Sequence, residues 1–326
     1  MLNVKYKMGI IFILCLILLT LASCKQVEKG GNQLSENEQI TVAKENLFSF
    51  EHPKTEQKYK IVHVNQLFHQ YIEKVKENKS HSNLQLYKEE IIQPIYKDCF
   101  ANGEYLYLAD TLLNTPPEKL GELQMISNII EKRKEEINQL IQESILKSAD
   151  LLPSQSDVAV CVFPSTYVDM SMFAVGAGKI IFPYNLNYTD DIIKAGIAHE
   201  YHHSVWTEKH LKNNTLNSVL DNIVFEGKAV MFQRTVYPDI DFPSVDLNYN
   251  KELWSKIEPD LNTYNLSRSL EIIQGGKELP RNYGYSEGYK MINSYLEYNP
   301  DKTPVDWTAV STQDIIEKGK YFENYK

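Results

Sequence analysis

The stretch that decides the fold covers residues 190–212 and reads DDIIKAGIAHEYHHSVWTEKHLK. Thr189 precedes it as a helix N-cap, and two aspartates follow in the first turn, where carboxylates interact favourably with the helix dipole. The stretch contains His199-Glu200-Tyr201-His202-His203. Because a helix repeats every 3.6 residues, His199 and His203 lie on one face, one turn apart. The sequence therefore predicts a long helix that presents two imidazoles side by side.

These two histidines are predicted to face the protein core, because they continue a helical stripe with Ile192, Ala195 and Trp206. An unpaired buried polar group costs about 1 to 3 kcal/mol, so buried imidazoles need a partner. Two nitrogen ligands at this spacing suit a tetrahedral zinc ion, and Glu200 beside them can take a proton from bound water. We expect one zinc ion per chain, with His199 and His203 as ligands and Glu200 as the catalytic base.

A third ligand is predicted in the next helix, which we expect from about residue 215 to 234. Glu226 continues the apolar stripe of Val219, Ile223 and Val230, where a carboxylate needs a positive partner. Gly227 costs a helix interior about 1 kcal/mol relative to alanine, which a close backbone approach would explain. Two histidines and a glutamate leave a fourth position open for water, which is typical of catalytic rather than structural zinc.

Other third ligands fit the pattern less well. The longer HExxHxxGxxH signature requires glycine and histidine where Trp206 and Lys209 stand. His210 is one residue out of register, Glu208 lies off the ligand face, and Asp221 lies about 140° around its helix from Glu226. We therefore assign the third position to Glu226.

The sequence also offers candidates for supporting roles at the site. Asp221 or Asn222, near Glu226, can orient a ligand histidine through its second ring nitrogen. Tyr285 or Tyr289 can supply the hydrogen bond that steadies an oxyanion, although tyrosines at this spacing also serve simply for packing. We expect His202 to be an exposed ring beside the site.

The chain also resembles the YjaZ-like predicted zinc-dependent proteases over about residues 150–326. The resemblance rests on the histidine motif, on the run from Asp221 to Ala229, and on Gly284-Tyr285-Ser286-Glu287-Gly288-Tyr289. It implies a gluzincin-like fold, proteolytic activity, and an edge strand within residues 176–182 that binds substrate by β-augmentation. An acidic residue that often follows the glutamate ligand by four in the wider gluzincin group is Val230 here.

The rest of the pattern predicts an α+β fold that is predominantly helical, with a small β-sheet. Apolar residues at helical spacing indicate a helical region over residues 51–150. Short β-rich runs at 158–163 and 176–182 precede the histidine helix, and further helices are expected at 251–262 and 286–298. We therefore expect a zincin-like metalloprotease domain over residues 151–326.

The first residues predict export. Lys5 and Lys7 precede an uncharged apolar run of about 15 residues, too short to span a bilayer and suited to a signal peptide of residues 1–23. Leu21-Ala22-Ser23-Cys24 resembles the bacterial lipobox, so we expect Cys24 to be lipidated and residues 24–50 to form a tether. An ordinary signal peptide or an uncleaved anchor remains the alternative.

The net charge limits the kinds of partner, and the cysteine content limits the possible disulfides. The net charge is −9, and loss of the signal peptide removes two lysines and leaves −11, which argues against nucleic acid as a partner. Outside the leader and Cys24 only Cys99 and Cys161 remain, and they can pair or serve as buried thiols.

The sequence predicts zinc-dependent hydrolysis of a peptide or protein substrate, by a metalloendopeptidase that a lipid anchor holds at the extracytoplasmic membrane surface. One alternative is a non-catalytic zinc lipoprotein that binds a partner. Another is a zinc amidase acting on a cell-wall peptide. The sequence leaves the substrate and the oligomeric state open.

Overall fold

The computed structural model describes residues 44–77, 83–211, 217–276 and 278–326. The expected signal peptide, the lipidation site Cys24 and most of the expected tether lie outside these residues. The tether ends earlier than expected, because η1 (Lys44–Asn46) and β1 (Leu47–Glu51) already belong to the fold. Among the described residues, no helix combines the length and the apolar character that crossing a membrane requires.

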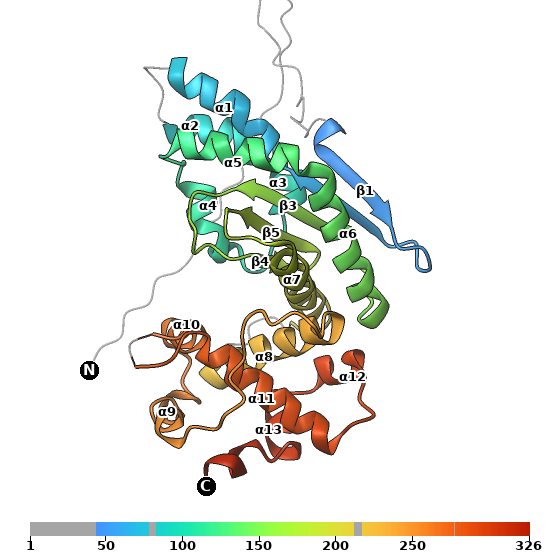
Figure 1. Ribbon diagram of the computed structural model, residues 1–326, viewed down its shortest axis with the longest axis vertical. Coiled ribbons are helices and arrows are strands. Elements are labelled where there is room, and N and C mark those ends of the chain that lie inside the picture. The colour runs from blue at the N-terminus through green and yellow to red at the C-terminus, as the bar shows by residue number, and fades with distance from the viewer. Residues whose placement is uncertain (1–43, 78–82, 212–216, 277) are drawn as a thin grey trace, which may run out of the picture. The chain divides into compact units, whose positions relative to one another are not determined.

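Five strands form one mixed sheet in the order β1-β2-β3-β5-β4 (Figure 1). The strands after β1 are β2 (Lys58–His63), β3 (Val158–Pro164), β4 (Phe173–Gly176) and β5 (Lys179–Tyr184). The central β3 pairs in parallel with β2 and β5, while β1 and β4 pair antiparallel with their single neighbours. β4 is therefore an edge strand.

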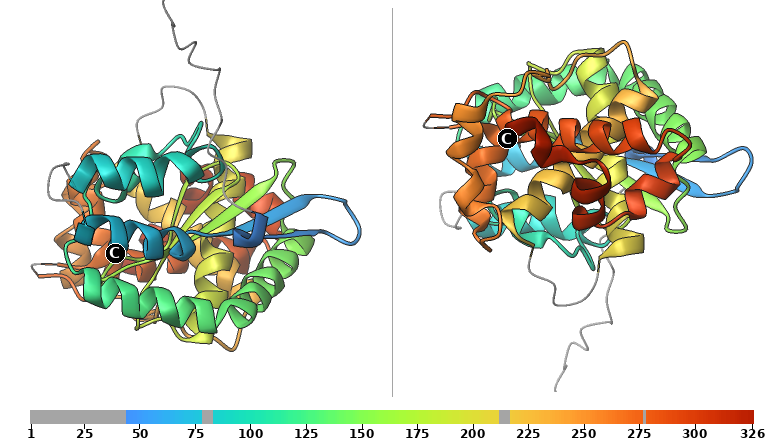
Figure 2. Two further views of the ribbon diagram at one scale, coloured as in Figure 1. Left: turned by 90° about the horizontal axis from the view of Figure 1, so that it is seen from above. Right: turned by 90° about the horizontal axis from the view of Figure 1, so that it is seen from below.

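Helices cover both faces of this sheet (Figure 2). Val160 and its alternate neighbours in β3 point into one core cluster, whereas Cys161 and Phe163 point into the other. Every residue of β3 is buried, as expected for a strand with parallel neighbours and two covered faces.

The helices fall into two groups. Those covering the Cys161 face are α1 (Asn65–Glu77), α2 (Asn83–Tyr87), the π-helical η2 (Lys88–Ile92), α3 (Gln93–Cys99), η3 (Leu106–Ala109) and α4 (Asp110–Asn114). α5 (Leu120–Lys132) contributes to both clusters, and α6 (Lys134–Leu151) and α7 (Asp190–His210) cover the Val160 face.

The C-terminal helices pack beyond α7, away from the sheet (Figure 1). They are α8 (Val219–Val236), α9 (Lys251–Ser255), α10 (Leu266–Gln274), α11 (Tyr283–Tyr298), α12 (Pro304–Ala309) and α13 (Thr312–Lys318), with the 3-10 turns η4 (Glu258–Asp260) and η5 (Tyr321–Tyr325).

The predominantly helical α+β class is confirmed, since 60% of the structure is helical and one small sheet is present. Two local expectations were wrong. Residues 58–63, placed in a helical region, form β2, which pairs with β3 and so joins the region before residue 150 to the sheet of the region after it. Of residues 176–182, expected as one strand that lies at the sheet edge, only 179–182 form a continuous strand, in β5, which lies inside the sheet; Gly176 ends the edge strand β4, and Gly178 with a φ of +70° makes the turn between them.

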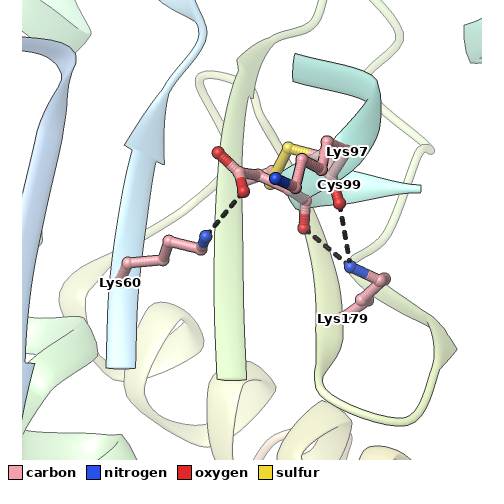
Figure 3. The surroundings of a disulfide bond; sticks show 6 residues. Lys60, Lys97, Cys99 and Lys179 are labelled. Atoms are coloured by element: carbon pink, nitrogen blue, oxygen red, sulfur yellow. Dashed lines mark hydrogen bonds and ion pairs between the residues drawn. A yellow bond between two sulfur atoms is a disulfide. The ribbon is translucent and has the colours of Figure 1, made fainter. Parts of the chain in front are cut away.

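Cys99 and Cys161 form a disulfide, one of the two possibilities that the sequence left open. Figure 3 shows its surroundings: Lys60 of β2 pairs with Asp98 at 2.6 Å, and Lys179 of β5 donates to two carbonyl groups at the end of α3. These contacts fix the C-terminal end of α3 against the central strands.

Candidate active site

α7 carries the histidine motif and begins as the sequence predicted. The Thr189 side chain accepts a hydrogen bond from the backbone N–H of Ile192, which caps the helix. His199 and His203 lie one turn apart, with their Nε2 atoms 3.0 Å from each other. Both side chains are buried, so the predicted inward orientation is confirmed.

α8 brings a carboxylate to this pair. Its N-terminus is fixed by a capping box between Ser218 and Asp221. Two turns into the helix, Glu226 Oε2 lies 3.2 Å from the Nε2 atom of His199 and 3.2 Å from that of His203. The structure thus brings the three predicted ligands together, and they are a group of side chains able to hold a metal ion.

Close contact between α8 and α11 sets this geometry. A Cβ atom built on Gly227 would lie 2.1 Å from the carbonyl carbon of Gly288, and one built on Gly288 would lie 2.2 Å from the carbonyl oxygen of Ile223. No side chain fits at either position. The expected close backbone approach at Gly227 is confirmed, and it holds α11 directly beside the turn that carries Glu226.

The charges at the site favour a bound cation. Burial alone would raise the pKa of Glu226, but the neighbouring charge of His203 and hydrogen bonds from both histidines hold it well below its usual range. Burial lowers the pKa of His199, yet its hydrogen bond with Glu226 raises it overall. A buried carboxylate in this state requires positive charge next to it.

The hydrogen-bond network orients His199 as a metal ligand requires. Gln233 donates its amide to the carbonyl of Phe242, so its oxygen faces His199 Nδ1 at 2.8 Å and accepts that proton. A neutral His199 then has a lone pair on Nε2, aimed at Glu226 and His203. Ligands about 2.1 Å from a tetrahedral zinc ion lie roughly 3.3 to 3.5 Å apart, close to the separations observed. The donor set and its spacing fit zinc.

Glu200 is buried beside this group but points to the sheet. Its Oε2 atom accepts the backbone N–H of Ala174, in the edge strand β4, at 2.8 Å. Burial raises the pKa of Glu200, and the nearby Glu226 adds to the rise, while the two histidines oppose it. A carboxyl group whose proton affinity is raised is suited to accept and return a proton.

The structure places the two candidate tyrosines, Tyr285 and Tyr289, in different surroundings. The Tyr285 ring centre lies 6.0 Å from that of His199, and burial together with the charges of Glu226 and Glu200 raises the pKa of its hydroxyl well above its usual value. Tyr285 is therefore a protonated hydrogen-bond donor next to the site. In contrast, the guanidinium carbon of Arg234 lies 5.3 Å from the centre of the Tyr289 ring. Tyr289 therefore packs against Arg234, and the catalytic role expected for it is corrected.

The prediction that Asp221 or Asn222 orients a ligand histidine was wrong. The Asp221 carboxylate is engaged with Ser218 in the capping box, and Asn222 donates to Ser269 at 2.9 Å. Gln233 performs the orienting contact with His199 instead. The available signal was its position seven residues after Glu226, two helical turns along the same face.

His202 is also corrected, because it is buried rather than exposed. Its ring stacks on Trp307 of α12 with centres 5.8 Å apart, and its Nε2 atom is 3.2 Å from the Thr308 hydroxyl. Lys228 extends to the same helix and donates to the carbonyls of Thr308 and Val310, and burial lowers the pKa of Lys228 to about 7. α12 thus closes the core behind the ligand helices.

Comparison with known proteins gives one match. The model of a family described as "Predicted Zn-dependent protease (DUF2268)" matches residues 137–317. No curated protein and no solved structure matches the chain. The matched range contains α7, α8 and α11, and with them every side chain of the metal group.

Proposed function

The chain belongs to this family of predicted Zn-dependent proteases, and from that premise we propose that it is a zinc metalloendopeptidase that hydrolyses peptide bonds of extended substrates. The observation that carries the proposal is the convergence of His199, His203 and Glu226 on one point, with Glu200 next to them. Three protein ligands leave a coordination position for water, which is the arrangement of catalytic zinc sites.

A bound zinc ion supplies Lewis acidity and makes water a nucleophile near neutral pH. Glu200 takes a proton from the attacking water and passes it to the nitrogen of the leaving amine. The Tyr285 hydroxyl, held protonated by burial, donates a hydrogen bond to the oxygen on which negative charge develops. Gln233 keeps His199 in the tautomer that directs its Nε2 lone pair to the site.

We also propose that the protein is exported and that Cys24 holds it by a lipid anchor at the extracytoplasmic membrane surface. The Cys99–Cys161 disulfide supports an oxidising compartment, where such bonds form and persist. The acidic net charge makes a peptide or protein the expected partner rather than a nucleic acid.

The first test is the metal content of the purified protein, by elemental analysis, for the wild type, His199→Ala and Glu226→Ala. We expect one zinc ion per wild-type chain and its loss in both variants, because each removes a ligand. His210→Ala, which removes a histidine at the end of the same helix, should keep the zinc. Wild-type protein that takes up no zinc after reconstitution contradicts the proposal and favours a partner-binding protein.

The second test separates zinc binding from catalysis. Glu200→Gln should keep the zinc ion and lose about 10² to 10⁴-fold in peptidase activity, because a carboxamide cannot accept the proton. Glu208→Gln, on the same helix and bonded to Ser154 and Gln155, is the matched control and should stay active. Full activity of Glu200→Gln with zinc bound would show that another group is the base.

A further inference from the structure

The edge of the sheet passes directly beside the candidate base. β4 pairs with β5 on one side only, and Ala174 of β4 donates its N–H to Glu200. A peptide that reacts at Glu200 must therefore place its scissile bond near Ala174. How far such a peptide can extend along β4 depends on what occupies the residues next to Ala174.

The residues that follow Ala174 are already engaged by another part of the chain. The backbone N–H of Tyr105 donates to the carbonyl of Val175 at 2.8 Å. The backbone N–H of Ala177 donates to Glu104 Oε2 at 3.0 Å. Residues 103–105, called the wall segment below, thus occupy the sheet edge immediately beyond Ala174.

Two glycines show how closely the wall segment fits this edge. A Cβ atom on Gly176 would lie 2.0 Å from Glu104 Oε2 and 2.7 Å from the Glu104 nitrogen. One on Gly103 would lie 2.8 Å from the carbonyl oxygen of Val175. The contacts to the Glu104 nitrogen and the Val175 carbonyl oxygen are to main-chain atoms, so the two main chains approach too closely to admit a side chain at either glycine.

The wall segment also reaches the ligand helix. The hydroxyl of Tyr105 lies 3.4 Å from the hydroxyl of Thr207. The Thr207 hydroxyl donates to the carbonyl of His203 at 2.8 Å. The segment therefore spans from β4 to α7, one turn after the second histidine.

The disulfide holds the start of the wall segment. Cys99 precedes Gly103 by four residues and is bonded to Cys161 of β3. Between them, the N–H of Gly103 donates to the carbonyl of Phe100 at 3.0 Å. A short turn anchored on the central strand thus carries the wall segment.

We propose that residues 103–105 form the end wall of the substrate-binding edge, so that a substrate pairs with β4 as far as Ala174 and not beyond. The inference rests on the proposed function and adds a constraint on the substrate: the cleaved bond lies within a few residues of one end of the bound peptide, or the peptide turns away from the sheet there. A longer peptide would have to displace the Tyr105 and Glu104 hydrogen bonds.

The wall segment stops a bound peptide from extending along β4 in one direction only. Which end of the peptide is limited depends on whether it runs parallel or antiparallel to β4. A substrate antiparallel to β4 meets the wall segment with residues on the N-terminal side of the cleaved bond, and a parallel one with residues on the C-terminal side. Extending a peptide at each end in turn therefore measures both the limit and the orientation.

The experiment uses one cleavable peptide sequence extended stepwise by alanines at its N-terminus or its C-terminus. For the wild type, kcat/KM should fall about tenfold beyond a fixed length at one end only, because longer peptides lose or must displace backbone hydrogen bonds. In Glu104→Ala/Tyr105→Pro, which removes the carboxylate that bonds Ala177 and the backbone N–H that bonds Val175, the ratio of kcat/KM for long over short peptides should rise about tenfold. Tyr264→Ala/Glu118→Ala, which removes an exposed tyrosine and an exposed glutamate outside the wall segment, should keep the wild-type ratio.

Measurements of peptide binding test the end wall separately from the proposed peptidase activity. The same peptides are titrated against Glu200→Gln protein by fluorescence anisotropy, with and without the wall substitutions. A one-sided length limit in affinity that the wall substitutions relieve supports the end wall even if no peptide is cleaved, which would overturn only the proposed function. Cleavage or binding that is indifferent to length at both ends overturns the end wall and leaves the proposed function intact.

Discussion

The two faces of the sheet are buried in different ways. On the Cys161 face, α1 to α4 pack apolar side chains such as Phe68, Tyr71 and Ile95 against the strands, and the disulfide crosses this layer. On the Val160 face, the layer of α6, α7, α8 and α11 buries histidines, acids, lysines and amides among its apolar side chains: His63, Asn138, His199, Glu200, His202, His203, Lys228, Gln233, Glu287 and Lys290.

The difference shows where stability and function reside. An apolar core tolerates exchange of one apolar side chain for another of similar volume, since any well-packed apolar side chain contributes to stability. Buried polar groups are stable only when each has its partner, as Glu287 has in Lys290 at 2.8 Å. Apart from Gln233, which bonds His199, the hydrogen bonds of His199, His203 and Glu226 described here join these three side chains to one another. The Val160 layer should therefore depend on zinc, and the Cys161 layer on packing and the disulfide.

Removal of zinc tests this contrast with the largest expected effect. At free zinc a thousandfold above its dissociation constant, binding adds about 4 kcal/mol to the free energy of unfolding. After chelation, amide hydrogen exchange should increase in α7, α8 and α11 and change little in α1 and α3. Equal increases in both layers would contradict the contrast, and Glu226→Ala should show no response to the chelator.

Loss of the disulfide tests the opposite layer. The Cys99→Ala/Cys161→Ala double variant opens a loop between residues 62 apart in sequence, which should lower the free energy of unfolding by roughly 2 to 4 kcal/mol. Urea denaturation measures the change, and zinc content should stay at one per chain. Loss of zinc in this variant would show that the two layers are not independent.

Substitution of Gly227 sharpens the contrast within the Val160 layer. Alanine there cannot fit against Gly288, so α8 and α11 must separate, at a cost of about 1 to 3 kcal/mol. Gly121→Ala in α5 is the matched control: nothing lies within 4 Å of its added Cβ, so helix propensity should increase stability by up to about 1 kcal/mol. Thermal denaturation of both variants should give shifts of opposite sign.

The smallest expected effect is a pH dependence at His63. Burial lowers its pKa below the usual 6.5, partly opposed by the hydrogen bond with Asn138 at 2.7 Å. The unfolded chain then binds more protons below pH 6.5, so the stabilising contribution present above that pH is lost as pH falls, by at most about 1.4 kcal/mol per pH unit. His63→Gln should reduce the loss of unfolding free energy between pH 7 and pH 5. An unchanged slope would assign the acid sensitivity to other groups.

The sequence correctly predicted that His199, His203 and Glu226 lie together, because the signals for that were local. One turn of helix separates His199 from His203, so their spacing alone fixed their common face. Glu226 and the close approach at Gly227 followed from a carboxylate on an apolar stripe and a costly glycine. The roles of Asp221, Asn222 and Tyr289 were wrong because near neighbours on a helix still point in different directions, and each found another partner.

Some features had no local signal. Lys58–His63 resembles a strand only in its alternation, and it became β2 because β3, almost a hundred residues later, pairs with it. Residues 176–182 were predicted as one strand because Ile180, Ile181 and Phe182 are typical of strands, and the turn at Gly178 was not recognised. His202 was expected in solvent because no sequence pattern shows that Trp307 lies over it.

The sequence by itself determined the ligand helix, its two inward histidines and the glutamate of the following helix, because helical periodicity places such residues without reference to the rest of the chain. Only the tertiary structure decided which amide orients His199, which tyrosine lies at the site, and that residues 103–105 occupy the sheet edge beside Glu200. These contacts join segments distant in sequence, and they exist because packing around the sheet brings those segments together.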